Sequence, residues 1–197
     1  MNTVRDYLSS DEKKNLVTSG SFGEGLEMRG SDLDIMFIEN RIEVYEDVKP
    51  RIHPNIPFLS MKTKDVKPGF TMLQLEYNRY HCFSKYFVEL NGRHYFSNAL
   101  YKQQFLTEKS NIHGPCLSNG LMDLAVCVHC KTWITHATHW ITRSNNSWPS
   151  KDVKQFIIKN GVLFVRIGVK GSSKEDLEWR ISFSVGEKLL INSFTHS

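Results

Sequence analysis

The sequence predicts an α+β fold in which helices flank a mixed central β-sheet. Strand-like stretches and helical stretches alternate along the chain, but without the strict strand–helix rhythm of a doubly wound parallel sheet. No internal repeat or low-complexity segment divides the 197 residues. Hydrophobic residues make up 40% of the chain and aromatic residues 12%, which is enough to bury one core. We therefore expect a single domain over residues 1–197.

Six stretches have the composition of strands. In FTMLQLEY apolar and polar residues alternate, which is typical of a strand with one buried face, whereas IMFI and LMDLAVCV are apolar enough for a fully buried strand. The predicted strands are Ile35–Ile38, Ile42–Val48, Phe70–Tyr77, Tyr86–Leu90, Leu121–Val128 and Val162–Val169.

Helices are predicted in four places. The best defined begins after Ser150, a good N-cap residue, and ends at Asn160 because Gly161 can adopt a positive φ. The other three are the polar residues up to about Asn15, the segment Phe96–Glu108, and the residues that follow Ser184, where Glu187 stands at capping-box spacing.

Composition excludes several classes of protein. No run reaches the 18 apolar residues of a spanning helix, and the first residues lack the apolar core of a signal peptide, so we expect a cytoplasmic or nuclear protein. The net charge of +4 permits phosphate contacts but does not argue for nucleic acid. In a reducing compartment the four cysteines are expected to be free thiols: Cys82, Cys116, Cys127 and Cys130.

A zinc site is one alternative use of two of these cysteines. Cys127 and Cys130 are followed by His136 and His139, which are zinc-ligand types. However, three residues is an odd step along an extended strand, and the loop between the pairs is short. We predict core thiols and surface histidines instead. The tryptophans Trp133, Trp140 and Trp148 are likewise expected to pack rather than to stack on bases.

The sharpest local motif joins a glycine-serine turn to two acids. Gly20-Ser21 precedes Asp32-Leu33-Asp34, which leads into the IMFI strand. Residues two apart on a strand face the same side, so Asp32 and Asp34 project together. Two carboxylates held so close favour Mg²⁺, which prefers hard oxygen ligands. An acidic turn before a strand is the other interpretation of these residues.

Two further observations bear on this motif. The turn can hold a phosphate tail, because Gly20 allows close backbone approach and Ser21 offers a hydroxyl and an N–H. It is not a P-loop, since Leu26 and Glu27 occupy the places of Lys and Ser/Thr. Asp123, inside LMDLAVCV, is a candidate third metal ligand because an acid in a buried strand is costly. A position at the solvent end of the strand would also account for it.

These segments together resemble a known family. GSFGEGLEMRGSDLDIMF, the Asp123 strand and EWRISFSVGEK are similar to the cyclic GMP-AMP synthase and Mab-21-like group of nucleotidyltransferases, particularly its invertebrate members. The resemblance implies a nucleotidyltransferase fold with an active site between this lobe and a second, helical lobe. That second lobe is expected to be missing, because the sequence stops after the helix that would begin it, so the domain is expected to be incomplete at its C-terminus.

The resemblance also implies the roles of individual residues. Gly20 and Ser21 would hold the triphosphate. Three acids would bind two Mg²⁺ or Mn²⁺ ions: Asp32, Asp34 and Asp123. Four residues would face the second nucleotide: Arg180, Ser182, Ser184 and Glu187. The implied reaction is attack of a ribose hydroxyl on the α-phosphate of ATP or GTP, with release of pyrophosphate. For Arg180, a surface ion pair with Glu178 or Glu187 is the alternative.

The implied partners are the substrates ATP and GTP and a double-stranded RNA or DNA activator, as in an innate immune receptor. A non-catalytic nucleotide-binding or scaffolding protein, or an inactive fragment, is the alternative function. The lysines that could meet nucleic acid are Lys62, Lys64, Lys67, Lys151 and Lys154. A solvated surface is the commoner fate of such scattered charges.

Overall fold

The computed structural model describes residues 14–19, 33–47, 55–78, 83–106, 111–118, 122–142 and 148–194. These ranges hold one 11-stranded sheet and helices on its flanks. The strands are β1 (Lys14–Ser19), β2 (Leu33–Tyr45), β3 (Phe58–Lys62), β4 (Phe70–Tyr77), β5 (Phe87–Leu90), β6 (Arg93–Phe96), β7 (Asn111–His113), β8 (Cys116–Ser118), β9 (Met122–Cys130), β10 (Val162–Val165) and β11 (Glu178–Ser182). The α-helices are α3 (Asn98–Gln103), α4 (Thr138–Thr142), α5 (Lys151–Asn160) and α6 (Ser184–Phe194). No helix in these ranges has the length and apolar composition needed to cross a bilayer.

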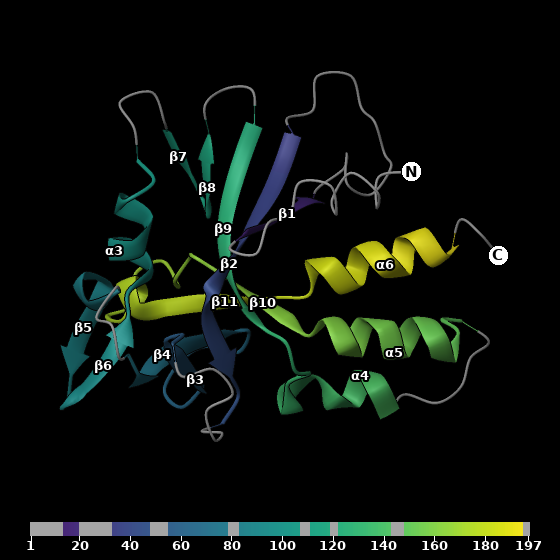
Figure 1. The fold of residues 1–197 in the computed structure, drawn as a ribbon, viewed down its shortest axis with the longest axis horizontal. Helices are drawn as coiled ribbons and strands as arrows, with labels where there is room; N and C mark the ends of the chain where they lie inside the picture. Colours follow the sequence, from purple (N-terminus) through teal and green to yellow (C-terminus); the bar gives the residue numbers. More distant parts are fainter. Residues whose placement is uncertain are drawn as a thin grey trace.

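The sheet is mixed, and part of it closes on itself. The strand order is β1-β2-β3-β4-β11-β10-β9-β8-β7, and β2 also pairs with β9. Strand β2 has three partners: β1 is antiparallel to it, whereas β9, along its first part, and β3, at its end, are parallel to it. The pairings β2-β3-β4-β11-β10-β9-β2 therefore form a ring. Helices α4, α5 and α6 lie beside one another on one side of this sheet, and α3 lies near β5 and β6 (Figure 1).

One face of the ring, here called the core face, carries the largest hydrophobic cluster. Each ring strand contributes to it, and an aromatic group lies within it. The Trp179 and Phe96 rings are stacked at 5.2 Å with 7° between their planes, and the Trp179 Nε1–H donates to the Phe96 carbonyl oxygen at 2.8 Å. Tyr101 from α3 packs beside them and is fully buried. Side chains therefore fill this face.

The helix predicted after Ser150 is confirmed residue for residue. The Ser150 Oγ accepts a hydrogen bond from the Val153 N–H at 3.3 Å, and α5 ends at Asn160. Gly161 has a φ of 66°, and a Cβ there would lie 2.0 Å from the Cys130 carbonyl oxygen. Glycine is thus needed both for the backbone angle and for the close approach to the end of β9.

Several predicted strands are confirmed, and the N-terminal helix prediction is wrong where it can be checked. Phe70–Tyr77 is β4, and Leu121–Val128 corresponds to β9. The end of the predicted polar helix lies instead in β1, where Asn15 pairs with Ile38. A local polar pattern does not reveal this pairing with a distant strand. Residues 1–13 lie outside the described residues.

Other element boundaries differ for local reasons. The two strands predicted within residues 35–48 are one strand, β2, whose pairing with β9 is irregular between Glu39 and Glu43. The predicted helix Phe96–Glu108 is shorter, because Phe96 ends β6 and Ser97 caps α3 by accepting from the Leu100 N–H. The last predicted strand ends at Val165, in β10. The strands not predicted were β1, β3, β6, β7, β8 and β11.

Candidate active site

The structure places two of the three predicted metal ligands side by side. Asp34 on β2 and Asp123 on β9 are directly paired in the parallel ladder. Paired residues on neighbouring strands project to the same face, and such strands lie about 4.8 Å apart. Each aspartate is the second residue of its strand. The two acids therefore stand together at the same end of two adjacent strands.

The face that carries this pair is here called the site face. Beyond the acids it continues into a second hydrophobic cluster, which is smaller than that of the core face. Met36 and Ala125, the next residues on this face, are themselves paired and buried. On the outer side of Asp123, Ser118 of β8 is paired with it. Apolar packing thus fixes the strands behind the carboxylates, and a hydroxyl-bearing residue flanks them.

Arg180 and Ser182 belong to the same face. Arg180 pairs with Val165, and Ser182 pairs with Leu163, two members of the site-face cluster. Arg180 is exposed and Ser182 is buried. Arg180 pairs with Val165 of β10, and Val165 pairs in turn with Cys127 of β9. Cys127 is four residues, or about 13 Å along the strand, beyond Asp123. The backbone of Arg180 therefore lies away from that of the two acids.

Ser184 and Glu187 lie at the beginning of α6. The Ser182 Oγ lies 2.7 Å from the Ser184 Oγ and accepts a hydrogen bond from the Ser184 N–H at 3.3 Å. The helix begins at Ser184 itself, so Ser182, not Ser184, bonds the first helical amide. Glu187 lies in the first turn, where a negative charge suits the helix dipole.

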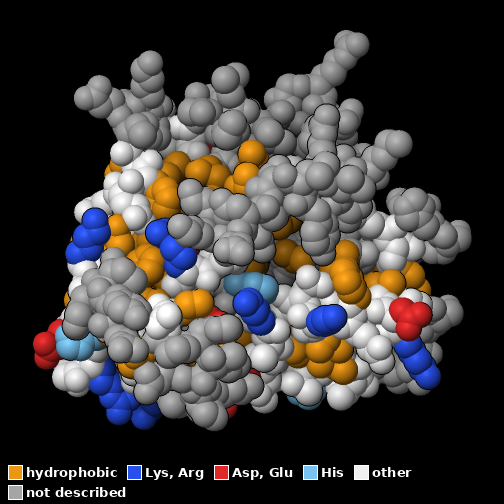
Figure 2. Space-filling view, viewed as in Figure 1, with side chains coloured by type: hydrophobic (Ala, Val, Ile, Leu, Met, Phe, Trp, Pro, Cys, Tyr) orange, Lys and Arg blue, Asp and Glu red, His pale blue; other side chains and the backbone are white. Residues whose placement is uncertain are grey.

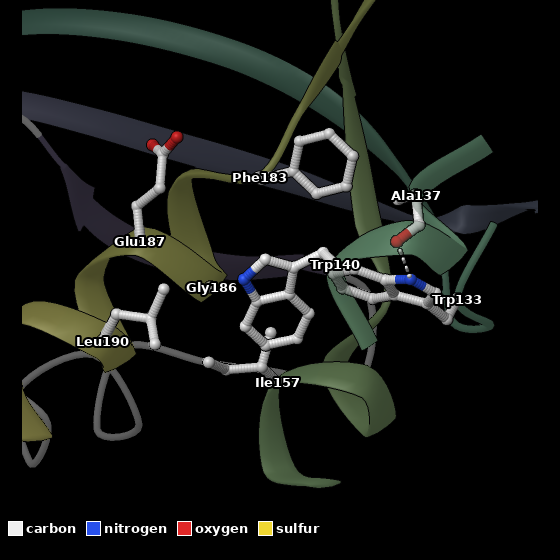
Figure 3. A pocket seen from close by; sticks show the side chains of 8 residues that line it. All are labelled: Trp133, Ala137, Trp140, Ile157, Phe183, Gly186, Glu187 and Leu190. Carbon is white, nitrogen blue, oxygen red and sulfur yellow. Dashed lines mark hydrogen bonds between the residues drawn. The ribbon is translucent and has the colours of Figure 1, made fainter. Parts of the chain in front are cut away.

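Glu187 also borders an apolar hollow of about 280 Å³ between α4, α5 and α6 (Figure 3). The Trp133 ring centroid lies 5.4 Å from that of Trp140 and 5.6 Å from that of Phe183. Two of the three tryptophans thus pack against neighbouring rings, as predicted, while Trp148 is 41% exposed. The remaining lining residues are Ala137, Ile157, Gly186 and Leu190.

A thiol that the sequence did not single out lies near the carboxylates. Cys116 of β8 pairs with Ala125 and so shares the site face. Burial raises the pKa of the Cys116 thiol above its ordinary value, and the negative charges of Asp123 and Asp34 raise it further. Arg180 and Arg166 act in the opposite direction. Cys116 is therefore a protonated thiol at neutral pH, and no local sequence signal marked its position.

The other predicted site residues lie outside the described residues: Gly20, Ser21 and Asp32. Within the described ranges, no group of three or more His, Cys, Asp or Glu side chains is arranged to hold a metal ion. The pair Asp34–Asp123 nevertheless has the chemistry that Mg²⁺ or Mn²⁺ requires, since both ligands are carboxylates at neighbouring positions on one face. The residues present therefore fit a hard divalent cation.

The interpretation of the cysteines as core thiols is confirmed for the described pair. Cys127 belongs to the site-face cluster and Cys130 to the core-face cluster, and both are fully buried and form no disulfide. The odd step between them thus sends them to opposite faces. The His136 side chain is 59% exposed and its Nδ1 lies 3.3 Å from the Glu46 carboxylate. Cys82 lies outside the described residues.

In the view of Figure 2 the described Lys and Arg side chains do not form one continuous patch. Lys62 pairs with Glu76 at 3.8 Å, and the Lys154 Nζ lies 5.9 Å from the centre of the Trp140 ring. The alternative ion pair of Arg180 with Glu178 is not formed, because the buried Glu178 carboxylate accepts from the Val169 N–H and the Ser172 hydroxyl.

A search of curated proteins finds no match to the chain. Among protein families, the Mab-21 protein nucleotidyltransferase domain matches residues 120–193, which is less than half of the chain. The matched segment runs from the beginning of β9 into α6 and so includes Asp123, Arg180, Ser182, Ser184 and Glu187. Over this segment, the chain is similar to the Mab-21 protein nucleotidyltransferase domain.

Proposed function

We propose that the chain is the catalytic lobe of a metal-dependent nucleotidyltransferase of the cyclic-dinucleotide-synthase type, which joins ATP and GTP and releases pyrophosphate. The observation that carries this proposal is the direct pairing of Asp34 with Asp123 on one face of the sheet. It is supported by the Mab-21 nucleotidyltransferase match, which includes Asp123. A cytoplasmic location and a role as a receptor for double-stranded RNA or DNA belong to the same proposal.

The proposed chemistry is a phosphoryl-group transfer. A ribose hydroxyl oxygen forms a bond to the α-phosphorus of a nucleoside triphosphate, the bond from that phosphorus to the bridging β-phosphate oxygen breaks, and pyrophosphate leaves. Two bound Mg²⁺ or Mn²⁺ ions would supply charge neutralisation at the attacking and leaving oxygens. Asp34 and Asp123, with Asp32 as the third acid, would hold these ions. Asp123 would also accept the hydroxyl proton.

The remaining proposed residues serve binding. Gly20 and Ser21 would hold the triphosphate. The exposed Arg180 guanidinium, on the site face but away from the acids, offers a planar donor fork to a base edge or a phosphate of the second nucleotide. Ser182 and Ser184, whose hydroxyl oxygens lie 2.7 Å apart, provide donors and acceptors beside it, and Glu187 lies one helical turn further along α6.

The test is to incubate the purified chain with ATP, GTP and Mg²⁺ or Mn²⁺, with and without double-stranded RNA or DNA, and to detect dinucleotides by mass spectrometry. A thermal shift with each nucleotide, measured with and without the metal, reports binding separately. Asp34→Asn should abolish the product and the metal-dependent shift. Asp152→Asn, on the first turn of α5, removes a carboxylate far from the pair and should leave both unchanged.

Two results would contradict the proposal. The first is neither product nor a metal-dependent nucleotide shift with any activator. The second is a product that survives Asp34→Asn. Product that forms only with RNA, or only with DNA, would identify the activating nucleic acid.

A further inference from the structure

A buried lysine links the last described helix to the first strand. Lys188 of α6 is only 6% exposed. Its Nζ donates to the Thr18 carbonyl oxygen at 3.1 Å and to the Thr18 Oγ1 at 2.9 Å, so one ammonium group holds two acceptors of one residue. A buried ammonium is costly unless such bonds compensate it. The contact joins residues at opposite ends of the sequence.

The residue that Lys188 holds lies next to the carboxylate pair. Thr18 pairs with Ile35, and the following residue, Ser19, pairs with Asp34. Among the described residues, strand β1 stands at one end of the strand path, with β2 as its neighbour. A strand with pairing on one side only is held less firmly than a central strand, so a side-chain contact there has a large effect on its position.

Helix α6 meets β1 through a second contact of a different kind. Val185 packs against the site-face cluster, and so does Val17 of β1. The first two turns of α6 thus carry an apolar contact to the site face, a buried charge on Thr18, and the two proposed nucleotide-binding residues Ser184 and Glu187. The same helix that would contact the nucleotide also holds the strand beside Asp34.

We infer that Lys188 is a positioning residue for the metal site: through Thr18 it fixes β1 against β2 and thereby sets the Asp34 carboxylate relative to that of Asp123. The inference rests on the proposed function in so far as those carboxylates bind a metal. Residues that orient metal ligands without touching the metal commonly change affinity by about 10–100-fold when replaced.

The experiment measures Mn²⁺ affinity by the electron paramagnetic resonance signal of the free ion, and amide hydrogen exchange across β1. Lys188→Met should weaken Mn²⁺ binding about tenfold and speed exchange in peptides that cover β1. Thr18→Val, which removes only the Oγ1 acceptor, should have a smaller effect in the same direction. Lys188→Arg, which keeps a cation that can reach Thr18, should restore most of the affinity.

Two control variants separate positioning from general loss of stability. Lys159→Met removes an exposed lysine of α5 and should change neither measurement. Thr135→Val removes a hydroxyl that donates to Glu46 at 2.8 Å, far from β1. It should lower the melting temperature without changing Mn²⁺ affinity. Asp34→Asn gives the signal expected when a metal ligand is lost.

The outcomes distinguish this inference from the proposed function. If the wild-type chain binds no Mn²⁺, or binds it equally well after Asp34→Asn, the proposed function fails. If Mn²⁺ binding depends on Asp34 but Lys188→Met binds it as tightly as the wild type, the positioning role of Lys188 is wrong. Unchanged exchange across β1 in Lys188→Met overturns the inference whether or not metal binds.

Discussion

The two faces of the sheet carry carboxylates in different ways. On the core face, the Glu39 carboxylate is fully buried and receives hydrogen bonds from the Arg41 guanidinium at 2.6 and 2.8 Å and from the Tyr101 hydroxyl at 2.9 Å. On the site face, Asp34 and Asp123 stand beside one another at strand ends. A carboxylate compensated by a cation and a hydroxyl stabilises a fold, whereas two adjacent carboxylates favour the arrival of a cation.

The same strands build both faces by simple alternation. In the β11 sequence Trp179-Arg180-Ile181-Ser182, the first and third residues pack with the core-face cluster, whereas Arg180 and Ser182 pair with members of the site-face cluster. In β9, Asp123 is followed by Leu124, which packs against the core-face cluster. A substitution on the core face should therefore lower stability, whereas a substitution at the next residue, on the site face, should lower activity. Four predictions test this difference.

The largest effect is expected at Trp179. Trp179→Ala removes a fully buried ring that stacks on Phe96 and donates a hydrogen bond to its carbonyl oxygen. Truncation of a buried tryptophan costs about 3–5 kcal/mol. Urea unfolding followed by circular dichroism should show this loss or an unfolded protein. A variant within 1 kcal/mol of the wild type would mean that the core face is not the main source of stability.

Asp123→Asn should lower activity without lowering stability. Loss of the proposed base and metal ligand should lower the rate of dinucleotide formation about 10²–10⁴-fold. In the absence of metal the free energy of unfolding should not fall, because one of two neighbouring like charges has been removed. Activity by mass spectrometry and urea unfolding without metal are the two measurements. Asp176→Asn, an exposed acid near β11, is the matched control.

Arg180→Ala, on the site face of β11, should lower nucleotide affinity while leaving stability nearly unchanged. Because Arg180 is exposed, the free energy of unfolding should change by less than about 0.5 kcal/mol. Nucleotide affinity, measured by calorimetry with Mg²⁺, should fall about tenfold, as expected for one lost charge-assisted contact. Arg180→Lys should lie between, since it keeps the charge but not the planar fork. Arg93→Ala is the control: a nucleotide affinity equal to that of the wild type would show that the loss in Arg180→Ala is specific to Arg180.

The smallest effect concerns the Glu39 carboxylate and its dependence on pH. Burial alone would raise the pKa of Glu39, but hydrogen bonds from Arg41 and Tyr101 outweigh it, so the pKa lies below its ordinary value of 4.5. Glu39 therefore contributes stability that is complete above pH 4.5 and is lost as the pH falls through its lowered pKa. Tyr101→Phe should cost about 1 kcal/mol at pH 7.

The measurement is the free energy of unfolding of Tyr101→Phe and of the wild type between pH 7 and pH 3. The difference should shrink below pH 4.5, because a protonated Glu39 gains less from the tyrosine hydroxyl. A difference that stays constant over this range would place the cost of the substitution in packing rather than in the hydrogen bond to Glu39.

The sequence allowed accurate prediction where the signal was local. The cap at Ser150, the glycine at 161 and the strand at Phe70–Tyr77 were predicted from consecutive residues, and all three are confirmed. The expected single buried face of β4 was wrong, because Thr71, Met72 and Leu73 are all buried. The predicted helix was wrong at its described end, because Lys14 and Asn15 pair with β2, which is distant in sequence. Short strands such as β7 and β8 were missed because three residues carry too little pattern.

For the site, motif and burial indicated the acids, and the family resemblance implied that they lie together, but the strand pairing that joins them could not be predicted. That Asp34 faces Asp123 depends on the register of two strands from different halves of the chain. Neither the placement of Cys116 near both acids nor the bond from Lys188 to Thr18 leaves a local trace in the sequence. Each depends on tertiary contacts, which one sequence by itself does not specify.

The parallel pairing of β2 with β9 also has a consequence for how the chain reaches its native state. The strands that bring Asp34 and Asp123 together are separated by almost half of the 197 residues. Pairing them closes a long loop, and the entropy cost of closing that loop comes before the stabilising contacts form. During synthesis, the first acid leaves the ribosome long before its partner. We therefore expect the carboxylate pair to form late in folding, after the other contacts of β2.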